Sequence, residues 1–140
     1  TVQAQILEVL DQLRARRGMA VLLITHDLGI VAGRADRVAV MYAGQIVEEA
    51  PTARLFARPS HPYTQGLFAS VPRIRGPLKR LNPIRGSVPA PYAWPSGCRF
   101  RPRCPQAFEK SEQEPPMLPV EPEHQMRCWL AEQPQKSSHG

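Results

Sequence analysis

Residues 19–50 read MAVLLITHDLGIVAGRADRVAVMYAGQIVEEA, and their periodicity decides the fold class. The six apolar residues 19–24 include β-branched side chains and are too few for a helix, so they predict a strand buried on both faces. Residues 37–50 predict two strands joined at Ala43-Gly44, because glycine permits the positive φ of a tight turn. A short helix over 28–34 fits between them, with Thr25 and Asp27 available to cap it.

The preceding residues 1–18, TVQAQILEVLDQLRARRG, have helical periodicity. Apolar side chains recur there at three- and four-residue steps, namely Val2, Ile6, Val9, Leu10 and Leu13. This pattern predicts a helix with one buried face. Arginines crowd its last turn, where cations meet the negative end of the helix dipole, and Gly18 suits a left-handed cap. Helix, buried strand, helix and hairpin together predict an α/β fold.

Charged residues and prolines are distributed unevenly along the 140 residues. Residues 61–105 carry eight Lys or Arg and no Asp or Glu, so the net charge of +6 belongs to this segment. Fourteen of the sixteen prolines follow residue 60. We expect an α/β part (1–60), a helical segment with a basic, proline-rich arm (61–96), a cysteine module (97–130) and a disordered tail (131–140). The N-terminus has no signal-peptide pattern and no apolar run could span a bilayer, which predicts a soluble, cytosolic chain.

His26 is the first candidate functional residue, because it directly follows the predicted buried strand. In open α/β sheets, ligands gather at the carboxyl ends of strands. A neutral imidazole there can hydrogen-bond a phosphate oxygen or a water. The position of His26 alone supports two roles equally: it binds a ligand, or it only caps the helix or satisfies a backbone group.

A family resemblance decides between these readings of His26. Residues 22–72, LLITHDLGIVAGRADRVAVMYAGQIVEEAPTARLFARPSHPYTQGLFASVP, strongly resemble the C-terminal part of the ATP-binding subunit of ABC transporters. HPYTQGLFASVP (61–72) and GCRFRPRC (97–104) resemble the branch that serves oligopeptide, dipeptide and nickel importers. The resemblance implies a C-terminal fragment of a P-loop NTPase nucleotide-binding domain with a small proline- and cysteine-rich extension. It implies that His26 is the catalytic switch histidine that contacts the ATP γ-phosphate, and that Asp27 is a helix cap.

Other parts of an ATP site are missing from the sequence. It has no G-x-x-x-x-G-K-[ST] loop, no Ser-Gly-Gly signature, and no apolar strand ending in the acidic pair that holds Mg²⁺. ATP and Mg²⁺ are therefore expected only in a complete subunit, and this chain alone should not hydrolyse ATP. We expect the first helix and residues 19–24 to leave apolar surface exposed, which would make the free chain marginally stable or prone to aggregate.

The resemblance also implies partners and a location. These are a second ATP-binding subunit, identical or not, transmembrane permease subunits and, indirectly, an external solute-binding protein, at the cytoplasmic face of the plasma (inner) membrane. The transported solute, a peptide or similar small molecule, is not specified by the sequence.

Cys98, Cys104 and Cys128 form the second candidate site, because an odd number of cysteines argues for a metal site or buried thiols rather than disulfides. His124 lies four positions before Cys128, and such a pair can share a metal. The resembled branch usually has four cysteines here, for a [4Fe-4S] cluster, and Ser111 stands at the third position. The residues leave three readings: a cluster with His124 or Ser111 as fourth ligand, a Zn²⁺ site, or a degenerate remnant.

Two alternative functions follow from the charge of residues 61–105. The basic arm with interspersed aromatic residues suits a metal-stabilised module that binds nucleic acid. Its prolines equally suit an extended subunit-docking surface without an ATPase role. A solvated arm that packs over acidic surface is favoured over nucleic-acid binding, because no base-reading fold accompanies the charge.

Overall fold

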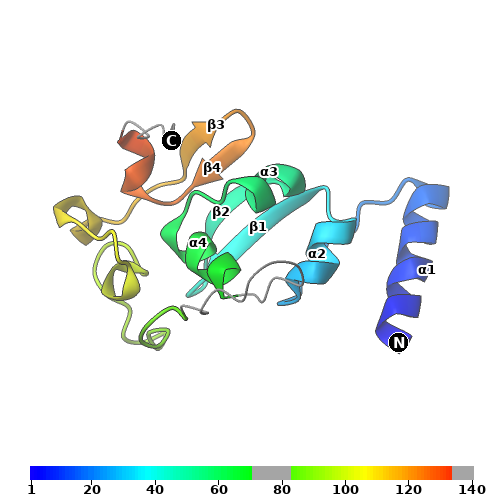
Figure 1. Cartoon of the computed structure of the whole chain (residues 1–140), viewed down its shortest axis with the longest axis horizontal. Helices are drawn as coiled ribbons and strands as arrows, with labels where there is room; N and C mark the ends of the chain where they lie inside the picture. Colours follow the sequence, from blue (N-terminus) through cyan, green and yellow to red (C-terminus); the bar gives the residue numbers. More distant parts are fainter. Residues whose placement is uncertain (71–82, 134–140) are drawn as a thin grey trace, which may run out of the picture.

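The structure, a computed structural model, describes residues 1–70 and 83–133. Helix α1 (Val2–Arg17) ends as its sequence predicts, because Gly18 adopts φ 63° and its N–H bonds the Arg14 carbonyl at 2.9 Å. Helix α2 (Leu28–Arg34) begins at Asp27, whose carboxylate accepts the Gly29 N–H at 2.8 Å. Figure 1 shows α1 standing at one end of the molecule, with α2 between it and the sheet.

A four-stranded antiparallel sheet forms the centre of the molecule (Figure 1). Strands β1 (Arg37–Tyr42) and β2 (Gln45–Pro51) form the predicted hairpin, whose turn residues Ala43 and Gly44 have φ of 47° and 77°. Strands β3 (Leu118–Glu121) and β4 (His124–Met126) form a second hairpin. Because β4 pairs with β2, the order is β1-β2-β4-β3, and the cysteine module extends the sheet of the first hairpin.

The hydrophobic core lies between this sheet and two short helices, α3 (Thr52–Ala57) and α4 (Pro62–Ala69). Its buried members are Val40, Tyr42, Val47, Ala50, Leu55 and Phe100. Phe100 is contributed by the cysteine module and makes edge contacts with the rings of Tyr42 and Tyr63. Helix α4 lies at the start of residues 61–96, where a helical segment is expected.

The remaining described segments contain only short helical turns. These are η1 (Arg101–Arg103), η2 (Glu109–Glu112) and η3 (Trp129–Glu132). Residues 83–96 of the predicted arm form neither helix nor strand, whereas residues 71–82 of that arm and 134–140 of the predicted tail lie outside the described residues. None of the helices in the described parts of the chain is both long and apolar enough to cross a membrane.

Two predictions about the first thirty residues are wrong. Residues 19–24 form no strand, and Leu22 and Ile24 are 88% and 87% exposed. Helix α1 buries none of its residues, so its apolar stripe faces solvent. The physical reason is that a strand needs a neighbouring backbone, and all four strands of the described sheet belong to residues 37–126. The expected exposed apolar surface is confirmed.

Candidate functional site

His26 is exposed, in the loop that connects α1 to α2. The residues on either side hold the chain by local hydrogen bonds. Thr25 Oγ1 accepts the N–H of Asp27 at 3.0 Å, and Asp27 Oδ1 accepts the N–H groups of Gly29 at 2.8 Å and Ile30 at 3.3 Å. The predicted capping role of Asp27 is confirmed, and the imidazole of His26 is free to meet a ligand from solvent.

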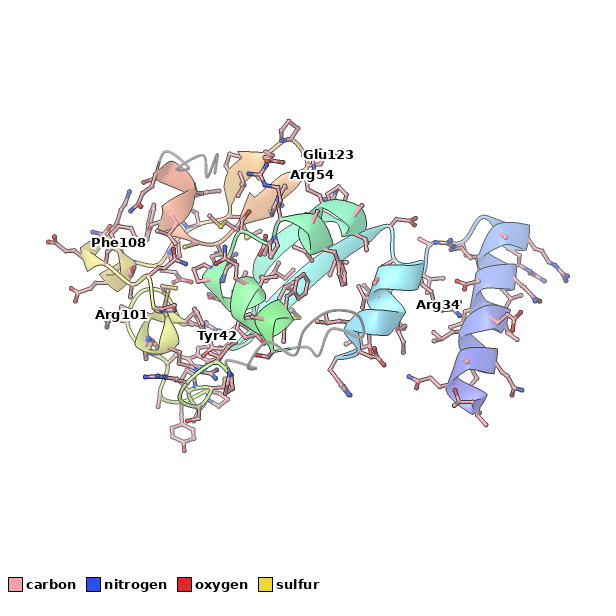
Figure 2. All side chains as sticks on the ribbon, viewed as in Figure 1. Arg34, Tyr42, Arg54, Arg101, Phe108 and Glu123 are labelled. Carbon is pink, nitrogen blue, oxygen red and sulfur yellow. The ribbon has the colours of Figure 1, made fainter. Side chains whose placement is uncertain are left out.

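Ion pairs join the two helices on either side of this loop. Arg34 of α2 bonds Asp11 of α1, and Arg14 of α1 bonds Asp36 just beyond α2 at 3.1 Å. Figure 2 shows Arg34 directed from α2 toward α1. A cavity of about 620 Å³ lies between the helices, and Asp27 lines it, whereas His26 does not. The cavity thus adjoins the loop at Asp27 and not at His26, and the two helices that flank the loop are joined by ion pairs.

The three cysteines lie in the cysteine module and carry free thiols. Cys98 and Cys104 bracket a helical turn, in which Cys98 O accepts the Arg101 N–H at 3.0 Å and Arg101 O accepts the Cys104 N–H at 3.2 Å. Cys128 is buried, at the end of β4. Burial, followed by the charges of Cys98, Cys104 and Glu48, raises the pKa of Cys128 to about 11, while burial also raises the pKa of Cys104. A metal bound by these thiols would displace their protons, because a metal ligand must be a thiolate.

The fourth position predicted for a metal ligand has a structural role. Ser111 is buried, its Oγ accepts the N–H of Phe108 at 3.2 Å, and its carbonyl accepts the N–H of Cys98 at 3.0 Å. Across residues 1–70 and 83–133, no three His, Cys, Asp or Glu side chains are arranged to hold a metal ion. The metal site therefore stays a prediction. His124, the other proposed metal ligand, is hydrogen-bonded to Glu48.

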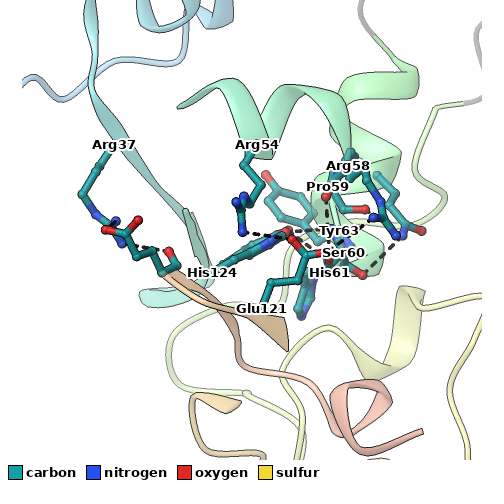
Figure 3. A network of polar contacts seen from close by, with 12 residues as sticks. Arg37, Arg54, Arg58, Pro59, Ser60, His61, Tyr63, Glu121 and His124 are labelled. Carbon is teal, nitrogen blue, oxygen red and sulfur yellow. Dashed lines mark hydrogen bonds and ion pairs between the residues drawn. The ribbon is translucent and has the colours of Figure 1, made fainter. Parts of the chain in front are cut away.

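His124 belongs to a buried polar cluster centred on Glu48 of β2. Glu48 and His124 are 0% and 2% exposed, and Glu48 Oε1 lies 2.7 Å from His124 Nε2. The same carboxylate accepts the backbone N–H groups of Ser60 at 2.7 Å and His61 at 2.9 Å. Figure 3 shows His124 close to the Ser60–His61 turn. One carboxylate thus joins β2, β4 and the start of α4, and it has enough hydrogen bonds to offset its burial.

His61 caps α4 in this cluster. Its Nδ1 accepts the N–H of Tyr63 at 3.0 Å, so the proton of the neutral ring is on Nε2. Burial lowers the pKa of His61 to about 4, and the charge of Glu48 and the backbone of Arg127 only partly oppose this. His61 is therefore a buried, neutral, structural imidazole at pH 7.

Sequence reasoning missed Glu48 and the buried roles of His61 and His124. A β-bulge explains part of the omission. Val40 pairs with Glu48 and Met41 with Ile46, so Val47 has no partner on β1. Strict alternation along β2 is broken there, and Val47 and Glu48 are both buried. The available signal was the pair Glu48-Glu49, since one of two consecutive strand residues normally faces the core.

Arginines of the cysteine module bind groups within the chain. Arg99 Nη1 donates to Ala43 O at 2.6 Å, and its guanidinium lies 3.3 Å from the centre of the Trp94 ring. Arg103 donates to the carbonyl of Arg85 at 2.8 Å, and Arg101 pairs with Glu112. Of the charge that suggested nucleic-acid binding, Arg99 therefore holds the β1–β2 turn, Arg103 holds the arm and Arg101 makes an ion pair inside the cysteine module.

Comparison with known proteins shows what this chain is similar to. The model of the family "Oligopeptide/dipeptide transporter, C-terminal region" matches residues 47–110. The oligopeptide transport ATP-binding protein AppD of Bacillus subtilis is 49% identical over 134 residues, which cover 95% of this chain and 41% of that protein. The chain is similar to the C-terminal region of oligopeptide/dipeptide ABC transporter ATP-binding proteins. The predicted resemblance is confirmed.

Other members of the oligopeptide/dipeptide family match a similar share of the chain. The dipeptide transport ATP-binding protein DppD of Haemophilus influenzae is 48% identical over 84% of this chain and 36% of its own length. The probable peptide ABC transporter ATP-binding protein y4tR of Sinorhizobium fredii is 50% identical over 92% of this chain and 39% of its own length. The chain thus spans about two fifths of the length of these relatives.

Proposed function

We propose that the chain is the C-terminal part of the ATP-binding subunit of an ABC importer, which couples ATP binding and hydrolysis to uptake of peptides or similar small solutes. The observation that carries this proposal is the identity of 48–50% to three peptide-transport ATP-binding proteins over 84–95% of the chain. We also propose that the chain is part of a P-loop NTPase domain and that this domain carries a cysteine-bearing extension.

In the complete subunit, His26 contacts the γ-phosphate of ATP. Three features of the loop support this role: its imidazole is exposed, the neighbouring backbone is fixed by Thr25 and Asp27, and the loop adjoins a large cavity. ATP and Mg²⁺ bind through the phosphate-cradling loop and the acidic strand that this sequence lacks. A hydrogen bond from His26 that strengthens as charge develops on the transferred phosphoryl group would raise turnover without much effect on binding.

The proposal places the subunit at the cytoplasmic face of the membrane. Its partners are permease subunits and a second ATP-binding subunit, with an external solute-binding protein acting indirectly. The apolar stripe of α1 and residues 19–24 then pack against other parts of the nucleotide-binding domain, which explains why Leu22 and Ile24 are exposed in this chain. The cysteine module holds its fold through the Glu48 cluster; iron, sulfide and zinc analysis of anaerobically purified protein tests whether a metal is also present.

The first test is ATP turnover by the complete subunit carrying His26→Ala. We expect nucleotide binding within about threefold of wild type and kcat lower by about two orders of magnitude or more, because a group acting in the transition state is lost. Tyr92→Ala is the control, since Tyr92 is 93% exposed and lies in the arm, remote in sequence from the loop. Undiminished turnover by the His26 variant would overturn the assignment.

The nucleic-acid alternative predicts salt-dependent retention of DNA by the chain. Arg99, Arg101 and Arg103 already bind groups within the protein, which argues against it. Retention of DNA on a filter at moderate salt would favour this alternative over the ATPase proposal.

A further inference from the structure

The loop that carries His26 is fixed by its own sequence neighbours. Thr25 Oγ1 accepts the N–H of Asp27 at 3.0 Å, so the bond spans His26 and closes a tight turn around it. Asp27 Oδ1 in turn accepts the N–H groups of Gly29 and Ile30 and starts α2. The backbone on both sides of His26 is therefore connected to the first turn of α2.

In this chain, side-chain packing does little to hold the loop that carries His26. Leu22 and Ile24 are 88% and 87% exposed, and His26 itself is exposed. Thr25 is only half-buried. In this chain few contacts restrain the loop, so the direction in which the imidazole projects depends on the backbone turn, which includes the hydrogen bond of the Thr25 hydroxyl.

We propose that Thr25 is a positioning residue for His26, acting through its hydrogen bond to the N–H of Asp27. This inference rests on the proposed role of His26 at the γ-phosphate. Thr25 does not touch the nucleotide; its hydroxyl holds the turn so that the imidazole meets the phosphoryl group without a search through loop conformations. Misplacement of a catalytic group by about 1 Å can lower a rate by as much as 10²-fold, so one turn bond is sufficient to matter.

Three variants of the complete ATP-binding subunit test this inference by kcat and KM for ATP. Thr25→Val keeps the β-branched shape but has no acceptor, and we expect kcat to fall about tenfold with KM within about twofold. Thr25→Ser restores the acceptor and should recover most of the activity. Tyr92→Ala is again the control, because Tyr92 is 93% exposed and lies in the arm; its kcat should match wild type.

A double-mutant cycle separates this inference from the proposed function. In the His26→Ala background, Thr25→Val should lower kcat no further, because the imidazole that Thr25 positions is gone. An equal effect of Thr25→Val in both backgrounds, wild-type kcat for Thr25→Val, or no recovery with Thr25→Ser would overturn the inference. Wild-type turnover by His26→Ala would instead overturn the proposed function.

A measurement on the present chain covers the case in which the Val variant misfolds. The ¹⁵N relaxation of the His26 amide should show greater mobility in Thr25→Val than in Thr25→Ser, while the amides of the β1–β2 hairpin stay unchanged. Equal mobility of His26 in both folded variants contradicts the inference.

Discussion

Individual histidines in this chain differ in role because their surroundings differ. His26 is exposed on a loop, whereas His61 and His124 are 1% and 2% exposed. His124 donates to a carboxylate, while His61 accepts a backbone N–H and remains neutral. Residue type alone therefore did not distinguish a ligand-facing imidazole from a structural one.

The lowered pKa of His61 makes stability depend on pH. Above pH 6.5 the ring is neutral in both folded and unfolded chains, so its contribution is fully present. Between pH 6.5 and about 4 the unfolded chain binds a proton that the folded chain excludes, so stability falls as pH falls, by up to about 3 kcal/mol. His61→Asn keeps a capping acceptor without titrating. Urea unfolding at pH 7 and pH 4.5 should show a smaller loss for the Asn variant; equal losses would contradict the prediction.

At the scale of elements, one carboxylate connects the two hairpins with α4. Glu48 lies on β2 and binds His124 on β4 and the amides that precede α4. On the outside, Glu121 of β3 binds Arg54 of α3 at 3.0 Å and Arg58 at 3.4 Å (Figure 3). The exposed pairs contribute little, while the buried one determines whether the cysteine module stays on the sheet.

Replacing Glu48 should release the cysteine module. Glu48→Gln turns one acceptor oxygen into a donor that faces other donors, so we expect a loss of about 2–4 kcal/mol in the free energy of unfolding. Its neighbour Glu49 is the control, because it is 32% exposed at the side chain and pairs with Arg37; Glu49→Gln should cost less than about 1 kcal/mol. Urea denaturation followed by Trp129 fluorescence measures both, and equal costs would contradict the assigned role of Glu48.

At the scale of the whole molecule, apolar surface is distributed unequally. The core joins the hairpins, α3, α4 and Phe100, whereas α1 and residues 19–24 expose Val2, Ile6, Leu22 and Ile24 at 56–88%. Exposed apolar patches of this kind promote association. The chain should therefore self-associate through its first 24 residues and not through its sheet.

Polar substitution on this surface should reduce self-association without loss of stability. In Leu22→Ser/Ile24→Ser, we expect a smaller aggregated fraction by light scattering and a Tm within about 2 °C of wild type, because neither side chain is in the core. Val40→Ser is the contrasting variant, since Val40 is 7% exposed and its replacement should lower Tm. Unchanged scattering by the double variant would show that another surface drives association.

Local patterns in the sequence determined the local structure of this protein. Gly18 ends α1, Asp27 starts α2 and Ala43-Gly44 turns the first hairpin, because each effect depends on residues within four positions. The exposure of His26 fits its predicted place at the end of an apolar run, and its catalytic role stays a prediction.

Only the tertiary structure decided which segments meet. Residues 19–24 have the composition of a buried strand but no neighbouring backbone, so they remain exposed. The pairing of β2 with β4 places Glu48 opposite Met126, and a buried hydrogen bond joins Glu48 to His124, 76 positions away. Contacts between residues so distant depend on shape and desolvation across the whole chain, and no periodicity in a single segment records them.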